Sequence, residues 1–438
     1  MKSRVIIVFV FLIVLLFVVI SGSLFAAPGN DVQRDNNGNL AYLPAIFGDY
    51  PVDMAGIDSG FWPTMQHDAA RTGYNAAERE LYPPLEQVWS EDLGTWNQVE
   101  NITTADDDLA ITGPTAGFRY NQVIMLDANN GSKRWDFTLP NGGGGSMLVA
   151  ATFDDDSVYF GGQDDSHFYS LFRNSGATKW QKSGFENLLG SEIAVVDGIV
   201  YVPDSSVGVI ALTADTGDLK WGADYSGNGA GLPLSYRNGT VYGVRGGTEL
   251  VALDATVGTE QWAFSPVPEF PWIIADSNQV IVKSGNSEIR SLNPTDGSTI
   301  YAKTFDFDLG VGALPALAKG MLFVPTYSAN DDDPDIVALD AADGGFLWSY
   351  EYDPGFVSNL VVANGIVYFT GTDITGDGNG VFGLDATSGT LIWSASLPDS
   401  GSVGGLAVSD GTLFVGHYSG SGPFIPGTGT VYAFRNAN

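Results

Sequence analysis

The segment GTDITGDGNG, residues 371–380, carries the oxygen-rich side chains of this chain that are best spaced to bind a metal ion. Asp373, Thr375, Asp377 and Asn379 stand at alternating positions, with Gly378 at the turn. Carboxylate and amide oxygens at this spacing match the first half of a calcium-binding loop. The bidentate Glu that completes such a loop would fall at Leu384. The match is partial, so the alternative interpretation is an ordinary polar turn.

Two further long loops are expected beside this segment. SANDDDPD (328–335) brings Asp331 and Asp333 as additional calcium ligands, and SGSGPFIPGTG (419–429) follows later in the chain. We expect these loops to form the rim of a funnel that binds a protein or carbohydrate ligand. Aromatic residues of neighbouring segments either stack on that ligand or fill the channel; they are Trp96, Tyr225, Phe270 and Tyr352.

No residue pattern for catalysis can be assigned. The chain has no Cys and three His, and it lacks a nucleophile elbow, a zinc motif and a phosphate loop. His67, His167 and His417 are far apart in the sequence and are expected to be solvated or at the edge of the core. Acidic residues occur in most loops, so carboxylate pairs suited to glycoside cleavage cannot be recognised from the sequence.

A repeat of about 40–50 residues must position these loops. Each copy has a Leu, a Gly five residues later and an aromatic residue four residues after the Gly, as in Leu253, Gly258 and Trp262. The glycines of the seven copies are Gly131, Gly176, Gly217, Gly258, Gly297, Gly344 and Gly389, and the aromatics are Trp135, Trp180, Trp221, Trp262, Tyr301, Trp348 and Trp393. Short alternating strands with polar turns predict an all-β fold of four-stranded antiparallel blades, a β-propeller. A side chain at the Gly would clash, and the aromatic ring can cover the seam to the neighbouring blade.

The number of blades follows from the chain ends. The last unit has three strand signals and ends at residue 435 without its aromatic strand. LEQVWSEDL (85–93), with Trp89 in the aromatic position, supplies the missing strand. We therefore predict an eight-bladed β-propeller over residues 85–438, whose last blade is closed by the N-terminal strand around Trp89.

The residues before the propeller fall into three segments. Residues 1–27 have Lys2 and Arg4 followed by a long apolar run, which predicts a signal peptide or, if uncleaved, a membrane anchor. Residues 28–60 are predicted to be a flexible linker, and residues 61–84 a lead-in that packs on the propeller. The body is therefore expected to be secreted, periplasmic or at the cell surface. The net charge of −32 excludes nucleic-acid binding and contact with anionic membranes, except through an uncleaved N-terminal segment. We expect a monomer.

The repeat resembles that of the PQQ-like (pyrroloquinoline quinone) β-propeller superfamily. VALDATVGTEQW (251–262), VALDAADGGFLW (337–348) and FGLDATSGTLIW (382–393) match its Ala-Leu-Asp-Ala, Thr-Gly, Trp signature, and FWPTMQHDAARTGYN (61–75) is similar to its lead-in. The resemblance covers residues 61–435 and includes quinoprotein dehydrogenases and non-catalytic BamB-like lipoproteins. It implies the fold and leaves activity open, since unrelated functions share propellers.

The departures from the family pattern favour a non-catalytic member. Alcohol-oxidising quinoproteins carry a vicinal Cys-Cys disulfide, and BamB-like lipoproteins a lipidated Cys, whereas this chain has no Cys. A quinone with three carboxylates needs Arg or Lys, and Arg173, Arg237, Arg245 and Arg290 are the strand-associated candidates. We expect no cofactor and a binding or scaffolding role. The alternative is an enzyme, either a PQQ- and calcium-dependent alcohol or sugar dehydrogenase or a polysaccharide-active enzyme using funnel carboxylates.

Overall fold

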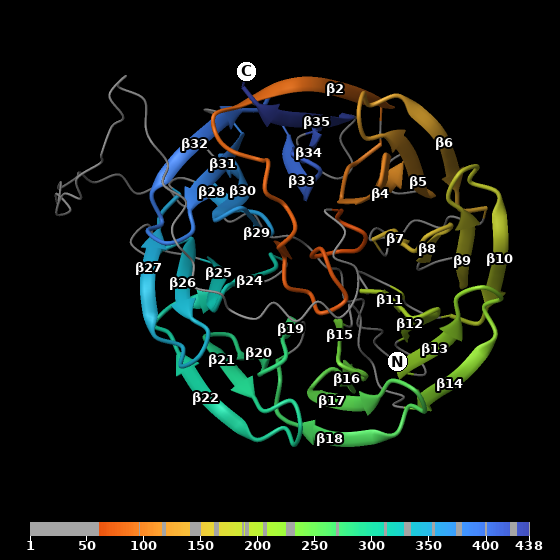
Figure 1. The fold of residues 1–438 in the computed structure, drawn as a ribbon, viewed down its shortest axis with the longest axis vertical. Helices are drawn as coiled ribbons and strands as arrows, with labels where there is room; N and C mark the ends of the chain where they lie inside the picture. The colour runs from red at the N-terminus through yellow and green to blue at the C-terminus, as the bar shows by residue number, and fades with distance from the viewer. Residues whose placement is uncertain are drawn as a thin grey trace, which may run out of the picture. The chain divides into compact units, whose positions relative to one another are not determined.

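The propeller body is a ring of eight β-sheets around a central axis (Figure 1). The computed structural model describes residues 61–95, 97–115, 120–140, 150–161, 166–185, 188, 192–204, 208–224, 233–268, 271–310, 313–327, 334–352, 355–373, 379–398, 401–420 and 427–437. No α-helix occurs in these ranges. The all-β, eight-bladed prediction is confirmed.

The first four blades follow in chain order, each from an inner to an outer strand. Blade 1 contains β3 (Asn101–Ala105), β4 (Asp108–Thr115), β5 (Tyr120–Asp127) and β6 (Lys133–Thr138). Blade 2 contains β7 (Thr152–Phe153), β8 (Ser157–Gly161), β9 (His167–Phe172) and β10 (Thr178–Ser183). Blade 3 contains β11 (Ala194–Val196), β12 (Ile199–Asp204), β13 (Gly208–Thr213) and β14 (Leu219–Asp224). Blade 4 contains β15 (Leu234–Arg237), β16 (Thr240–Arg245), β17 (Glu249–Asp254) and β18 (Glu260–Phe264).

The remaining blades keep this order, with the inner strand split in blades 6 and 7. Blade 5 contains β19 (Ile273–Ala275), β20 (Val280–Gly285), β21 (Glu288–Leu292) and β22 (Thr299–Thr304). Blade 6 contains β23 (Asp308–Leu309), β24 (Ala316–Ala318), β25 (Met321–Tyr327), β26 (Ile336–Asp340) and β27 (Phe346–Tyr350). Blade 7 contains β28 (Gly355–Val357), β29 (Val361–Ala363), β30 (Ile366–Asp373), β31 (Gly380–Asp385) and β32 (Leu391–Ser396), and β1 (Tyr74–Asn75) adds in parallel to β29.

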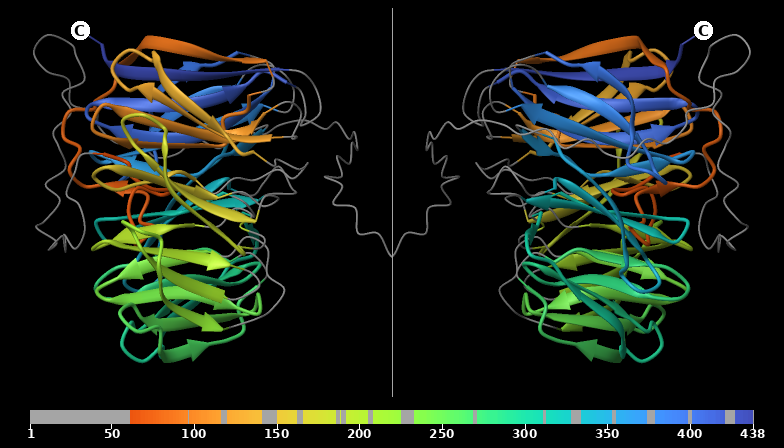
Figure 2. Two further views of the ribbon diagram at one scale, coloured as in Figure 1. Left: turned by 90° about the vertical axis from the view of Figure 1, so that its right-hand side faces the viewer. Right: turned by 90° about the vertical axis from the view of Figure 1, so that its left-hand side faces the viewer.

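The ring closes by pairing its two chain ends, as predicted. Blade 8 contains β33 (Ser402–Ser409), β34 (Thr412–Tyr418), β35 (Thr428–Asn436) and β2 (Leu85–Thr95). β2 is the outer strand and runs antiparallel to β35, with Trp89 opposite Ala433. Edge-on views show the strands of each blade running between the two faces of the ring (Figure 2). Closure in this way joins the ends of the ring within one hydrogen-bonded sheet.

The repeated Gly and aromatic residues meet at the seams between blades. At each turn between the third and fourth strands, the Gly adopts a positive φ and lies against the ring of the preceding blade's outer strand. A Cβ built on Gly258, for example, would lie 2.5 Å from Cε3 of Trp221. The same pairing joins Gly131 to Trp89, Gly176 to Trp135, Gly217 to Trp180, Gly297 to Trp262, Gly344 to Tyr301 and Gly389 to Trp348. Each of blades 1 to 7 therefore presents a flat glycine surface to the ring of the preceding blade.

A hydrogen bond fixes the indole ring in most of these seams. Each Nε1–H donates to a backbone carbonyl across the seam, from Trp135 to Arg173, Trp180 to Ala214, Trp221 to Ala255, Trp262 to Pro294, Trp348 to Ala386 and Trp393 to Leu85. These distances are 2.8–3.2 Å. Trp89 is the exception, since its buried Nε1 has no partner. The indole thus combines apolar burial with one directed polar contact.

Tyr301 is the weak position in this series, and replacing it by Trp is expected to stabilise the ring. Its buried hydroxyl has no hydrogen-bond partner, and burial raises the pKa of that hydroxyl. In Tyr301→Trp the indole N–H would reach the carbonyl of Ala341, the equivalent of Ala386. We expect the free energy of unfolding to rise by about 1 kcal/mol, measured by urea denaturation. Trp348→Tyr is the matched reverse change and should be destabilising; a loss of stability in Tyr301→Trp would contradict this account of the seam.

Residues 1–60 lie outside the described ranges. The signal peptide or anchor at 1–27 and the linker at 28–60 therefore stay predictions. Among the residues that are described, no helix is long and apolar enough to span a bilayer.

Candidate functional site

The lead-in segment lies across the axis of the ring and contacts the eight blades in order (Figure 1). Backbone N–H groups of the inner strands donate to its carbonyls, from Thr104 to Trp62, Phe153 to Pro63, Tyr236 to Ala69, Ala275 to Ala70, Leu317 to Thr72 and Val362 to Gly73. The lead-in contacts blades 3 and 8 through side chains. Thr64 Oγ1 donates a hydrogen bond to the Ile193 carbonyl at 3.1 Å, and Asn75 Nδ2 donates to the Val408 carbonyl at 2.8 Å. We call residues 62–78 the axial plug.

The plug has this path because the inner strands of a propeller expose one edge to the axis. Each such strand pairs with a second strand on one side only, so its N–H groups on the other side need acceptors. The carbonyls of the plug supply them. The backbone of the plug bends to do so, and Gln66, His67, Arg71 and Gly73 all have φ between +57° and +73°. Left-handed conformations at residues other than glycine are costly, so the surrounding contacts must hold them.

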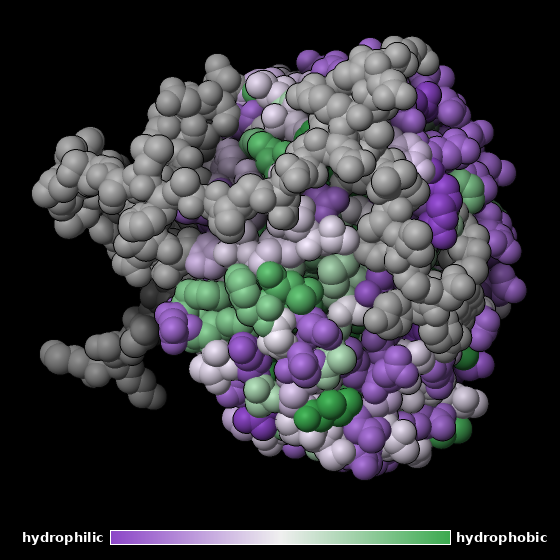
Figure 3. Space-filling model, turned by 60° about the vertical axis from the view of Figure 1, so that its left-hand side comes forward, coloured by the Kyte–Doolittle hydropathy of each residue, from purple (hydrophilic) through white to green (hydrophobic). Residues whose placement is uncertain are grey.

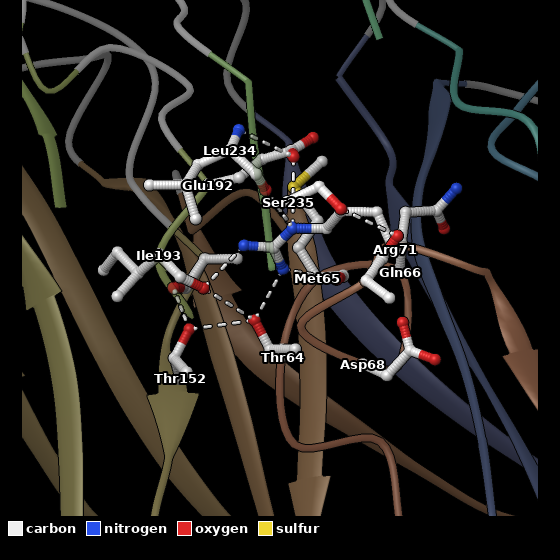
Figure 4. A network of polar contacts seen from close by, with 12 residues as sticks. Thr64, Met65, Gln66, Asp68, Arg71, Thr152, Glu192, Ile193, Leu234 and Ser235 are labelled. Atoms are coloured by element: carbon white, nitrogen blue, oxygen red, sulfur yellow. Dashed lines mark hydrogen bonds and ion pairs between the residues drawn. The ribbon is translucent and has the colours of Figure 1, made fainter. Parts of the chain in front are cut away.

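Arg71 is the polar centre of the plug (Figure 4). The side chain is 2% exposed, and its Nε lies 3.1 Å from Oε2 of Glu192 and donates to the Leu234 carbonyl at 2.8 Å. Nη1 donates to Oγ1 of Thr64 and to the Met65 carbonyl, and Nη2 donates to the Ile193 carbonyl at 2.6 Å. The guanidinium therefore joins the plug to the inner strands of blades 3 and 4.

The ion pair between Arg71 and Glu192 is removed from water. Burial raises the pKa of Glu192, whereas the charge of Arg71 and the N–H of Leu234 lower it. Burial also lowers the pKa of Arg71, and Glu192 opposes that effect. Two charges taken out of water are tolerated only when each is paired and hydrogen-bonded. Here the acceptors around Arg71 meet that condition.

The rest of the plug is also occupied by internal contacts. Asp68 accepts hydrogen bonds from the backbone N–H and the hydroxyl of Thr72, at 2.9 and 2.6 Å. Gln66 Nε2 donates to the Pro315 carbonyl at 2.7 Å. His67 is 8% exposed and its ring packs edge-on against Trp62, with centroids 5.0 Å apart. The expectation that this His is solvated or at the edge of the core does not match its burial.

The proposed calcium ligands fall mostly outside the described residues. Asp331, Asp333 and Asp377 are not described, and for Asp373 only the backbone at the end of β30 is described. Asn379 is 3% exposed, and its Nδ2 donates to the Pro398 carbonyl at 3.0 Å and towards the Gly401 carbonyl at 3.5 Å. No group of three potential metal-binding side chains occurs among the residues searched, which are the described ones. The calcium site stays a prediction.

Of the aromatic residues expected near the funnel, Tyr352 can be placed. Its ring lies against Gly371, where a built Cβ would be 2.4 Å from Cζ, and it packs edge-on to Phe382 with centroids 5.0 Å apart. Its backbone N–H donates to the buried carboxylate of Asp335 at 2.7 Å. Tyr352 therefore belongs to a packed aromatic cluster of blades 6 and 7. Trp96, Tyr225 and Phe270 lie outside the described residues.

Arg173, Arg245, Arg290 and Lys283 do not form a quinone-binding set. Arg173 pairs with Asp106 and Asp108 at 2.7 and 2.5 Å, Arg245 with Glu249 and Glu260, and Arg290 with Glu288. Each of these guanidiniums is held at its own blade or seam by carboxylates. Lys283, 2% exposed, donates to the carbonyls of Leu309 and Gly310. A tricarboxylate would need several of these cations together, so these residues do not fit the cofactor.

Sequence reasoning identified the lead-in but not its role at the axis. The buried Arg71 lies in a short segment without periodic hydrophobicity, and its partners Ile193 and Leu234 are 122 and 163 residues away. The composition of the lead-in could have indicated this role. Many side chains that form hydrogen bonds lie directly before the regular strand repeat, namely Thr64, Gln66, Asp68, Arg71 and Asn75.

Solved structures with this architecture include dehydrogenases and BamB. A quinohemoprotein alcohol dehydrogenase from Comamonas testosteroni is 16% identical, with a TM-score of 0.66 over 87% of this chain and 81% of that chain. A europium-containing methanol dehydrogenase is 16% identical, with a TM-score of 0.66 over 86% and 98%. BamB from Moraxella catarrhalis is 17% identical, with a TM-score of 0.58 over 80% and 99%. Likeness at these identities shows the fold alone.

Sequence comparison gives the family. No protein of curated function matches the chain significantly. A family model described as outer membrane protein assembly factor BamB matches residues 86–228, 164–304 and 285–422, overlapping stretches that together span most of the propeller. This match agrees with the repeat, the closed ring of eight blades and the structural neighbours. The chain therefore belongs to the BamB-type family of PQQ-like propellers.

Proposed function

We propose that this protein is a non-catalytic binding or scaffolding module that acts outside the cytoplasm. The observation that carries the proposal is the axial plug. In it, the buried guanidinium of Arg71 forms an ion pair with Glu192 and donates hydrogen bonds to the backbone carbonyls of Leu234 and Ile193. The axis of the ring is thereby built as a structural core. Arg173, Arg245 and Arg290 are likewise paired with carboxylates of the chain itself. We therefore place the ligand on the face predicted to carry the long loops.

The family description supports a protein ligand and an extracytoplasmic location. The matched family is described as an outer membrane assembly factor, a role that requires contact with other proteins. We therefore favour a polypeptide over a carbohydrate at the funnel face, which is the face predicted to carry the loops 328–335 and 371–380. The predicted N-terminal signal or anchor agrees with this location.

Two measurements on the full chain test this proposal. In the first, the protein is incubated with pyrroloquinoline quinone and calcium, and dye reduction is followed with alcohols and aldoses; we expect no turnover above the quinone alone. In the second, a photo-crosslinker is attached through Ser402→Cys on the funnel face or through Thr216→Cys at a turn on the opposite face. Both residues are exposed, and the chain has no other Cys. We expect envelope proteins to crosslink from Ser402→Cys and not from Thr216→Cys. Quinone-dependent turnover, or equal crosslinking from both faces, would overturn the proposal.

A further inference from the structure

The outer strands of blades 6 and 7 differ from those of the other blades because they carry no charged residue. β27 reads FLWSY and β32 reads LIWSAS. Every other outer strand has at least one charge: Lys133, Arg134 and Asp136 in β6, Lys179 and Lys182 in β10, Lys220 and Asp224 in β14, Glu260 in β18, Lys303 in β22, and Glu86, Glu91 and Asp92 in β2. Charges on an edge strand oppose pairing with another chain. That protection is missing from two adjacent blades of a chain with a net charge of −32.

Apolar side chains replace the charges on this part of the ring. The residue before the seam aromatic is Arg134, Lys179 and Lys220 in blades 1 to 3, but Ile300, Leu347 and Ile392 in blades 5 to 7. Ile300 is 49% exposed, Leu347 45%, Phe346 59% and Leu391 43%. We call Ile300, Phe346, Leu347, Leu391 and Ile392 the neutral rim. Figure 3 turns the β27 side of the ring forward and shows apolar surface gathered there, bordered by polar surface.

The outer strands of the neutral rim also have backbone N–H and C=O groups on the edge that faces away from their sheets. β27 pairs with β26, and β32 with β31, and each is the last strand of its sheet in the described part of the chain. In an antiparallel ladder, alternate residues of such a strand direct their N–H and C=O groups away from the sheet. An added strand would satisfy these groups and cover the exposed Phe346 and Leu347.

We propose, in place of the monomer expected from the sequence, that the neutral rim is the interface between two copies of this chain, docked edge to edge through β27. A twofold interface uses the same patch on both subunits, so the patch must be self-complementary. An uncharged strand edge with apolar side chains meets this requirement, because pairing β27 with itself brings no like charges together within the strand. On β2, β10, β18 and β22, which carry charges of one sign, two identical edges would repel each other. The acidic residues Asp343 and Glu351 lie just beyond the two ends of β27, so they oppose this pairing where salt does not screen them. This surface is separate from the funnel face, so the inference stands or falls independently of the proposed ligand.

Charge repulsion between two acidic bodies gives this interface a distinctive salt response. Each copy has a net charge of −32, and salt screens exposed charges beyond about 8–10 Å at physiological ionic strength. Association through the neutral rim should therefore strengthen as salt rises from low to physiological concentration. Association through ion pairs would weaken over the same range.

Cysteine crosslinking of the full chain tests the interface, because the natural sequence has no Cys. Leu347→Cys places a thiol on the neutral rim. Leu219→Cys is the matched control, since Leu219 is an exposed Leu on β14, the outer strand of blade 3 that also carries Lys220. With a short bismaleimide, we expect severalfold more covalent dimer from Leu347→Cys than from Leu219→Cys, rising with salt. Any proximity caused by the N-terminal apolar segment affects both variants equally.

Sedimentation of the otherwise unmodified full chain completes the test. We expect a dimer that becomes a monomer in Leu347→Lys, which gives blade 6 the basic residue that Lys220 already provides in blade 3. Leu219→Lys should remain a dimer. Equal crosslinking of the two Cys variants, a monomeric wild-type chain, or a Leu347→Lys variant that still dimerises would each overturn the proposal. A monomeric wild-type chain whose neutral rim binds a strand of another protein would also overturn it.

Discussion

Arg71→Met is expected to lower the free energy of unfolding by about 3–5 kcal/mol, because it leaves the buried carboxylate of Glu192 without its counter-charge. Methionine retains much of the apolar stem but none of the donors, so the carbonyls of Leu234 and Ile193 also lose their partner. Both charged side chains are almost fully buried, at 2% and 7% exposure, so solvent screens the pair only weakly. Urea denaturation followed by tryptophan fluorescence measures the loss.

The pH dependence of that loss separates charge from packing. Burial raises the pKa of Glu192 above its ordinary 4.5, so the folded protein binds this proton more readily than the unfolded chain. The Glu192 contribution to stability therefore falls as the pH rises above about 4.5 towards the folded-state pKa. Removing Arg71 raises that pKa further. We expect the stability gap between wild type and Arg71→Met to be small in mild acid and to widen towards neutral pH.

Glu192→Gln provides the control for this prediction. In the Arg71→Met background it removes the orphaned charge and should recover part of the lost stability at neutral pH. In the wild-type background it leaves Arg71 with Thr64, Met65, Ile193 and Leu234 as acceptors, so its effect should be smaller than that of Arg71→Met. If the gap were independent of pH and Glu192→Gln gave no rescue, the role of Arg71 would be packing rather than charge compensation.

The contrast between the seam and the plug explains how far the sequence could be interpreted. Each seam needs one flat residue and one large ring, so Gly258 and Trp221 recur as types at a fixed spacing, and this period predicts the ring and its closure through Trp89. Arg71, in contrast, has no counterpart in the repeats. Its contacts depend on the place where blades 3 and 4 meet the axis of the ring. Because its partners lie more than a hundred positions away, no periodic pattern in the sequence reveals its role.

The candidate site was less predictable for a related reason. The spacing of Asp373 and Asp377 predicts metal ligands. It does not show whether hydrogen bonds to neighbouring groups already occupy the side chains of such a site. Asn379 illustrates this, because its amide is hydrogen-bonded to the carbonyl of Pro398. Tyr352 likewise looks like an exposed aromatic in the sequence, yet it packs on Gly371 and Phe382. Hydrogen-bond competition and packing depend on tertiary contacts, which local residue types do not determine.

Gly258→Ala is expected to destabilise the ring by about 2–5 kcal/mol, combining backbone strain with overpacking of the seam. Gly258 has a φ of +73°, and a Cβ there would lie 2.5 Å from Cε3 and 2.7 Å from Cδ2 of Trp221. The indole cannot retreat freely, because its Nε1 is hydrogen-bonded to the Ala255 carbonyl at 3.0 Å and the ring packs against Tyr201. Urea denaturation gives the loss of stability, and near-ultraviolet circular dichroism reports displacement of the ring.

Gly239 separates the two contributions within the same blade. It has a φ of +79°, close to that of Gly258, but a Cβ built on it has no neighbour within 4 Å. Gly239→Ala should therefore show the left-handed strain alone, about 1–2 kcal/mol, with an unchanged near-ultraviolet spectrum. The excess in Gly258→Ala then measures the steric demand of the seam. An equal loss in both variants would mean that the seam yields to an added methyl group, and the Gly would recur for its backbone conformation and not for its contact with the ring.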